Sequence, residues 1–259
     1  MQGMTSFDDI YDSPDPRAYF TRLAPLSYEI PHHAQAVFRR TVAERADPHL
    51  TVLDLCCSYG INAALLNHDL TLADLYAHYT APGTRRLTTS ELIAYDKEFY
   101  ASRRRPDAVR VLGLDIARSA LDYAHAVGLL DGVHADNLEA HSPTPALSAA
   151  MADVGLITLT GGGSFLSRRT FAALLECARR PVWVSAFILR TMPYAPIASC
   201  LAGFGLTTRT DPDRTYPQRT FTAPQERRAA VSAVRLAGLD PTGRETDGSY
   251  HAALYESRP

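Results

Sequence analysis

The stretch Asp54-Leu55-Cys56-Cys57-Ser58-Tyr59-Gly60-Ile61-Asn62 combines an acidic residue with small residues at alternate positions. It joins an apolar run typical of a buried strand, residues 50–55, to a run typical of a helix, residues 60–68. Small residues at 56, 58 and 60 allow a sharp turn and let the backbone approach a ligand closely. Because a helix start also presents free N–H groups, this stretch predicts a binding loop for a small polar ligand.

Polar residues also end three other predicted strands. Asp115 closes the second strand, Asp136 and Asn137 close the third, and Thr160-Gly161 follow the fourth. Ligands of parallel sheets bind at the carboxyl ends of the strands, near the point where the strand order reverses. We therefore expect these residues beside the loop, with the Asp115 carboxylate placed to accept hydrogen bonds from the two hydroxyls of a ribose.

The elements that must position these residues alternate between strand and helix. This order favours an α/β fold with a doubly wound, mostly parallel sheet, followed by an antiparallel addition. The predicted strands are 50–55, 109–115, 133–136, 153–160, 182–189 and 250–256, with a hairpin over 206–222. The predicted helices are 31–46, 60–68, 71–79, 88–104, 117–127, 146–151, 168–179, 194–204 and 224–237.

The chain has 259 residues, enough for one large domain with insertions. We expect a helical lid at residues 1–47 and a ligand-binding domain at residues 48–259. Residues 69–107 form a helical insertion that starts and ends at the opposite end of the sheet. Residues 191–222 form an insertion at the ligand edge, because they follow the carboxyl end of the fifth strand.

The loop resembles the first motif of the class I S-adenosylmethionine (SAM) dependent methyltransferases, an acidic residue followed by glycines at alternate positions. In this chain the series is Asp54, Cys56, Ser58 and Gly60, so only the last glycine is present. The resemblance implies a Rossmann-like fold of that type with SAM as cofactor. It also implies a set of SAM-binding residues: Asp54, Cys56, Cys57, Ser58, Gly60, Asn62, Asp115, Ile116, Asp136, Asn137, Thr160 and Gly161.

The resemblance implies an enzyme, a SAM-dependent transferase of small-molecule metabolism that passes a methyl group to a small-molecule acceptor. The alternative is a SAM cyclase of lyase type on the same fold. It would release methylthioadenosine and form 1-aminocyclopropane-1-carboxylate or azetidine-2-carboxylate. A third class, a SAM-binding protein without turnover, stays open as well.

Aromatic and histidine side chains gather in the predicted lid. A sulfonium cation is stabilised beside an aromatic face by roughly 0.5–2 kcal/mol, and a histidine can serve as a general base near neutral pH. The candidate catalytic residues are Tyr11, Tyr19, Tyr28, His32 and His33.

Two other enzyme classes compete for the same loop. A dinucleotide fingerprint needs G-x-G-x-x-G with an acid about 20 residues later, but the first glycines are missing and Asp115 lies much further on. Ser58 also imitates the nucleophile of an α/β-hydrolase, with Asp240 or Asp247 and then His251 following in the required order. Against this, the hydrolase nucleophile follows several strands, and His251 falls inside a predicted strand.

Composition excludes further classes. The formal net charge of −2 argues against nucleic-acid or anionic-membrane partners. Pyridoxal chemistry is disfavoured because the single lysine, Lys97, lies between two acids on a predicted surface helix. The histidines and cysteines lack metal-ligand spacing, so we expect no metal. We expect a bacterial protein, because the excess of arginine over lysine is typical of a GC-rich genome. We expect it to be cytoplasmic, because the sequence shows no secretion signal and no membrane span. A homodimer stays open.

Overall fold

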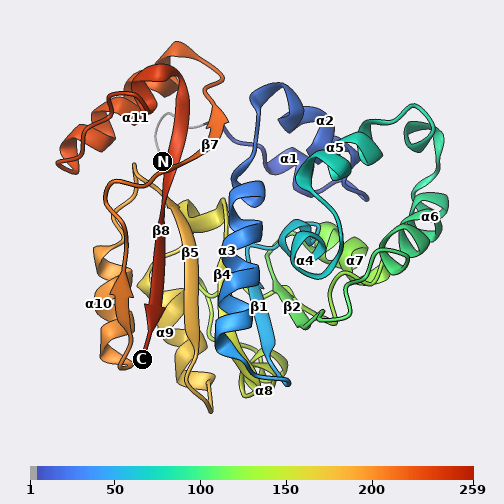
Figure 1. Ribbon diagram of the computed structural model, residues 1–259, viewed down its shortest axis with the longest axis horizontal. Helices are drawn as coiled ribbons and strands as arrows, with labels where there is room; N and C mark the ends of the chain where they lie inside the picture. Colours follow the sequence, from blue (N-terminus) through green and yellow to red (C-terminus); the bar gives the residue numbers. More distant parts are fainter. Residues whose placement is uncertain (1–4) are drawn as a thin grey trace.

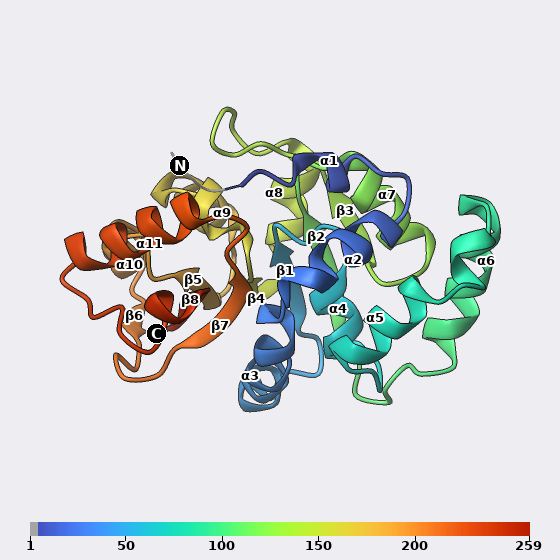
Figure 2. The same cartoon turned by 90° about the horizontal axis from the view of Figure 1, so that it is seen from above.

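The computed structural model describes residues 5–259, which form an eight-stranded sheet with helices on both faces (Figures 1 and 2). Five parallel strands lie in the order β3-β2-β1-β4-β5, β8 runs antiparallel to β5, and β6 and β7 both pair with β8. The strands are β1 (Thr51–Leu55), β2 (Arg110–Leu114), β3 (Gly132–His134), β4 (Val154–Leu159), β5 (Trp183–Leu189), β6 (Thr207–Arg209), β7 (Tyr216–Thr220) and β8 (Ser249–Arg258). The predicted doubly wound, mostly parallel sheet of a Rossmann-like α/β fold is confirmed.

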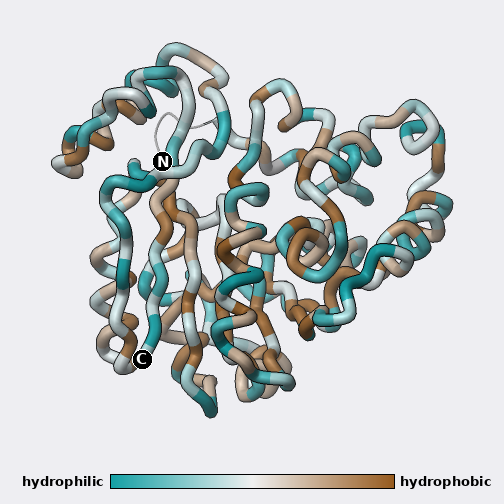
Figure 3. The backbone as a smooth tube through the Cα atoms, in the orientation of Figure 1, coloured by the Kyte–Doolittle hydropathy of each residue, from teal (hydrophilic) through white to brown (hydrophobic). Residues whose placement is uncertain are grey.

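Successive side chains of each strand pack into two different cores, because they point to opposite faces of the sheet. In β1, Val52 belongs to one core and Leu53 and Leu55 to the other. The helices of the first core are α3 (Ile30–Arg45), α4 (Ile61–Asn67) and α7 (Arg118–Ala126), and those of the second are α8 (Pro145–Met151), α9 (Arg168–Cys177) and α10 (Ala195–Gly203). Hydrophobic stretches therefore recur along the central strands (Figure 3).

The prediction of a hairpin over residues 206–222 is wrong. β6 pairs with residues 256–258 and β7 with residues 249–252, so the two short strands lie at opposite ends of one edge of β8. An isolated pair of such short strands would be marginally stable in water, whereas β8 offers each of them a long edge that is already part of the sheet. As a result, β7 lies beside the carboxyl ends of the parallel strands.

The N-terminal helices rest on the inserted segment 69–107. The two ends of this segment lie side by side, since His68 and Arg104 form an isolated β-bridge. Its helix α5 (Leu72–Thr80) nevertheless reaches the helix α2 (Arg17–Leu23), where Phe20 stacks on Tyr79 with ring centroids 4.7 Å apart. Both figures show α2 beside α5, with α6 (Thr89–Ala101) further out (Figures 1 and 2). The insertion therefore supports the N-terminal helices.

An ion pair fixes this contact. The Arg17 guanidinium lies 2.7 Å from Asp15 Oδ2 and donates from Nη1 to the carbonyl oxygens of Thr84 and Leu87. The Asp15 carboxylate is almost fully buried and also accepts from Thr89 Oγ1 at 2.8 Å. These bonds satisfy the buried charge at both ends, as a buried ion pair requires.

No helix within residues 5–259 is both long and apolar enough to cross a bilayer.

Candidate ligand-binding site

The loop between β1 and α4 follows the path of a glycine loop although it contains only one glycine. Cys56, Ser58 and Gly60 have φ angles of 55°, 50° and 74°. All three are left-handed, and they are the three positions at which the resemblance expects glycine. A residue with a Cβ is strained there by roughly 1–2 kcal/mol. The loop therefore keeps the predicted turn at a cost in backbone strain.

Glycines on neighbouring elements make room for the side chains of this loop. A Cβ built on Gly162 would lie 2.3 Å from Cys56 Cβ, and one built on Gly113 would lie 2.7 Å from Cys57 Sγ. Atoms that are not bonded to each other do not approach this closely in a packed interior. Gly113 on β2 and Gly162 after β4 therefore leave the space that the side chains of Cys57 and Cys56 occupy.

Ser58→Gly is expected to stabilise the protein by about 1 kcal/mol, because relief of the left-handed strain exceeds the entropic cost of glycine. The Ser58 hydroxyl is also buried without a partner among the described residues, so its removal carries no hydrogen-bond loss. Urea unfolding of the ligand-free protein measures the effect. Ser58→Ala is the control, since it removes the hydroxyl and keeps the Cβ; equal stabilisation by both variants would show that strain is not the cause.

Asp115 closes the loop from the end of β2. Its Oδ2 accepts from the backbone N–H of Ser58 at 2.8 Å, and its Oδ1 accepts from that of Ala117 at 2.9 Å. Burial raises the pKa of this carboxyl, whereas the two backbone bonds lower it. Each carboxylate oxygen can still accept a further bond. Asp115 therefore joins the ends of β1 and β2 and keeps acceptor capacity at the site.

Asp54 lies beneath the loop with one oxygen unpaired. Its side chain is 1% exposed, and Oδ1 accepts from Asn62 Nδ2 at 3.0 Å and from Thr158 Oγ1 at 2.9 Å. Its Oδ2 has no partner among the described residues. Burial raises the pKa of this carboxyl to about 7, while the two hydrogen bonds oppose the shift. Asn62 also donates to Thr160 Oγ1, so a buried polar network runs from β1 through α4 to β4.

One cavity of about 630 Å³ lies against this loop, within the size range of ligand sites. It lies at the carboxyl ends of β1, β2, β3 and β4. Ten of the predicted SAM-binding residues line it: Cys56, Cys57, Ser58, Asn62, Asp115, Ile116, Asp136, Asn137, Thr160 and Gly161. Asp54 and Gly60 are adjacent to the lining but do not form part of it.

The predicted catalytic residues separate into two groups. Tyr11, Tyr19 and Tyr28 line the cavity, and the ring centroid of Tyr19 lies 6.1 Å from those of the other two. Burial raises the pKa of Tyr19 and of Tyr28 well above that of an ordinary tyrosine, so both are neutral near pH 7. His32 is exposed on α3 and His33 packs against Tyr216, so the structure does not bring these histidines to the cavity.

Sequence reasoning missed several residues of the cavity. Gln218 and Arg219 enter from β7, Phe165 enters from the turn after β4, and Thr5 and Phe7 enter from the N-terminal segment. The sequence predicts that residues 191–222 lie at the ligand edge, but the wrong hairpin pairing gives no reason to select Gln218 and Arg219 from this segment. The composition of residues 5–7 contains no signal that would place them at a ligand.

The charges of the cavity favour a cationic ligand. Four carboxylates line it, whereas Arg219 is the sole lysine or arginine among the described lining residues. The lining carboxylates are Asp12, Asp115, Asp136 and Glu139. No group of three or more His, Cys, Asp or Glu side chains in residues 5–259 is arranged to hold a metal ion.

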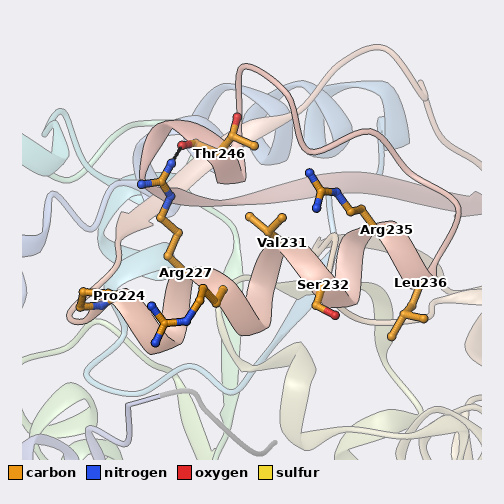
Figure 4. A pocket seen from close by; sticks show the side chains of 8 residues that line it. Pro224, Arg227, Val231, Ser232, Arg235, Leu236 and Thr246 are labelled. Atoms are coloured by element: carbon orange, nitrogen blue, oxygen red, sulfur yellow. Dashed lines mark hydrogen bonds between the residues drawn. The ribbon is translucent and has the colours of Figure 1, made fainter.

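A second hollow, on the outer face of α11 (Pro224–Leu236), has a different character (Figure 4). It has a volume of about 580 Å³ and lies along one helix, opposite the short turn that contains Thr246. Arg227 reaches across it to the Thr246 carbonyl. Its lining consists of arginines with small or apolar residues and holds none of the predicted site residues, so we place the site in the first cavity.

Known structures with a similar fold are found, whereas no family model and no curated protein matches the sequence. Magnesium protoporphyrin IX methyltransferase from Synechocystis PCC 6803 with bound SAM is 12% identical, with a TM-score of 0.41, over 88% of this chain and 79% of that chain. A structure described as "Conversion of a Disulfide Bond into a Thioacetal Group during Echinomycin Biosynthesis" is 13% identical, with a TM-score of 0.49, over 97% and 91%. Mycolic acid cyclopropane synthase CmaA1 with SAH and CTAB is 11% identical, with a TM-score of 0.43, over 97% and 94%.

Proposed function

We propose that this chain binds SAM in the cavity between the loop and the N-terminal helices and transfers its methyl group to a small-molecule acceptor. One observation carries the proposal. A left-handed loop and the Asp115 carboxylate face one another at the carboxyl edge of a parallel sheet, in a cavity whose charges favour a cation. SAM is a sulfonium cation, so the charge of the lining fits it.

The residues divide the cavity into an adenosyl end and a methionine end. Asp115 accepts hydrogen bonds from the ribose hydroxyls, and Asp136 and Asn137 meet the adenine amino group. The loop and Asn62 hold the methionine part, and Asn62 connects it to the buried Asp54 carboxylate beneath the loop.

Tyr11, Tyr19 and Tyr28 flank the sulfonium in this proposal and exclude water from it. Their neutral rings stabilise a cation by about 0.5–2 kcal/mol. Residues 1–47 act as the lid; residues 1–4 of that segment lie outside the described residues. When bound, SAM supplies a methyl group that a nucleophile displaces from sulfur. The protein contributes in-line positioning, which is worth as much as about 7–11 kcal/mol.

The test has two steps. First, calorimetric titration with S-adenosylhomocysteine (SAH) is expected to show binding that is lost at high concentrations of SAM; absence of binding overturns the proposal. Second, the nucleoside product is measured after incubation of the protein with SAM and a mixture of small amines, phenols and thiols. SAH as the product supports methyl transfer. Methylthioadenosine formed by SAM alone, above the protein-free control, overturns methyl transfer in favour of the cyclase.

A further inference from the structure

A β-bulge turns two consecutive polar side chains of β7 into the cavity. The register between β7 and β8 shifts between Pro217 and Arg219, so Gln218 is the extra residue of the pair of strands. In a regular strand two consecutive side chains would point to opposite faces, and bulges next to sites re-aim them. Gln218 and Arg219 both line the cavity, and they are only 5% and 4% exposed.

The guanidinium of Arg219 is fixed at one edge and open at the other. Its Nη1 and Nη2 donate to the two carboxylate oxygens of Glu226 at 3.1 and 2.6 Å, and Nη1 also donates to the Thr220 carbonyl at 2.9 Å. No described residue accepts a hydrogen bond from the Nε of Arg219, and none bonds to the side-chain amide of Gln218. Neither of these two groups is completely buried. The free Nε–Nη2 edge has the spacing that binds a carboxylate through two bonds.

The Glu226 carboxylate does not fully neutralise the positive charge of Arg219. The Glu226 carboxylate also accepts from the backbone N–H groups of Thr5 and Thr222, at 3.0 and 2.7 Å. Burial opposes its ionisation, but these bonds and Arg219 together hold the pKa of Glu226 down at about 2. Because several donors share this carboxylate, the guanidinium keeps positive potential at its open edge.

A carboxylate in this cavity has one place to bind. Everywhere else the charged lining is acidic, and a ligand carboxylate near Asp12, Asp115, Asp136 or Glu139 would meet like charge. The ring centroids of Phe7 and Tyr250 lie 5.2 and 4.9 Å from the guanidinium carbon of Arg219, so two aromatic residues pack against this guanidinium.

We propose that Gln218 and the open edge of Arg219 form a carboxylate-binding subsite of the cavity. Two sources of the carboxylate fit, the amino-acid end of SAM and a carboxylate on the acceptor. The first source rests on the proposed function. The second source restricts the acceptor to a carboxylic acid. Its carboxylate would accept hydrogen bonds from the side-chain amide of Gln218 and from the guanidinium of Arg219.

The variants Arg219→Lys and Gln218→Leu test the subsite. Lysine keeps a charge beside Glu226 but lacks the second edge, and leucine removes the amide. Arg190→Lys is the matched control, because Arg190 is 8% exposed, pairs with Glu245 at 2.6 Å and does not line the cavity. Thermal unfolding establishes that each variant is folded before calorimetry.

If the carboxylate belongs to SAM, Arg219→Lys weakens SAH binding about ten-fold or more and leaves the binding of decarboxylated SAH within two-fold. If it belongs to the acceptor, SAH binding is unchanged, and the SAH-saturated wild-type protein binds benzoate but not benzylamine, with benzoate binding lost in both variants. The subsite is overturned if the variants match the Arg190→Lys control for SAH and benzoate, or if SAH and decarboxylated SAH weaken equally. Failure of wild-type protein to bind SAH overturns the proposed function instead, and benzoate binding still tests the subsite.

Discussion

Asp54→Asn is expected to stabilise the ligand-free protein at pH 8. Burial raises the pKa of Asp54 to about 7 from its ordinary value of 3.8, so the unfolded chain releases this proton at lower pH than the folded protein. Stability therefore falls as the pH rises from about 4 to about 7 and is level above that range. A rise of this size corresponds to about 4 kcal/mol, which the neutral asparagine recovers.

Urea unfolding of both proteins between pH 5 and pH 8 measures this effect. Asp54→Asn removes the decline with pH that the wild-type protein shows. Asn62→Asp, which adds a carboxylate to the same network, is expected to steepen the decline. An Asp54→Asn protein that is less stable than wild type at pH 8 would contradict the assignment of a costly, unpaired charge.

Asp115→Ala is expected to weaken the binding of SAH by about 1–3 kcal/mol, or about 10–100-fold, through loss of charge-assisted hydrogen bonds to the ribose. The structure adds a second consequence, because Asp115 also accepts from the backbone of Ser58 and Ala117. The variant should therefore lose stability as well, by about 1 kcal/mol for each bond.

Methylthioadenosine separates the two consequences of Asp115→Ala. It carries the ribose but lacks the amino-acid end, so a ribose contact predicts equal weakening for methylthioadenosine and SAH in calorimetry. Asp115→Asn is the control that keeps one acceptor oxygen and restores part of the stability. Weakening confined to SAH would show that Asp115 acts on the loop and not on the ribose.

The loop and Asp115 could be predicted because strand ends and short-range residue spacing fix their positions. A buried run followed by small residues determines a turn whatever the rest of the chain does, and Asp115 meets that turn because parallel neighbours end at one edge. The packing of Cys56 and Cys57 could not be predicted, since it depends on space provided by Gly162 and Gly113, which are distant in the sequence.

The β7 side of the cavity was beyond sequence reasoning for a different reason. Period-two alternation predicts that Gln218 and Arg219 point to opposite faces, and a bulge set by the pairing with β8 overrides it. The support of α2 by the insertion rests on the stacking of Phe20 on Tyr79, residues that are 59 positions apart and carry no local signal. Such contacts follow from tertiary packing alone.

The position of β8 has a consequence for the synthesis of the protein. β7 has β8 as its strand partner, and β8 comprises residues 249–258. On the ribosome the parallel strands and the glycine-poor loop are complete long before these residues emerge. A nascent chain that ends before residue 249 lacks β8 and therefore the wall of the cavity that β7 forms. Such a chain would bind an adenosyl ligand weakly, so tight ligand binding would report on the final stage of folding.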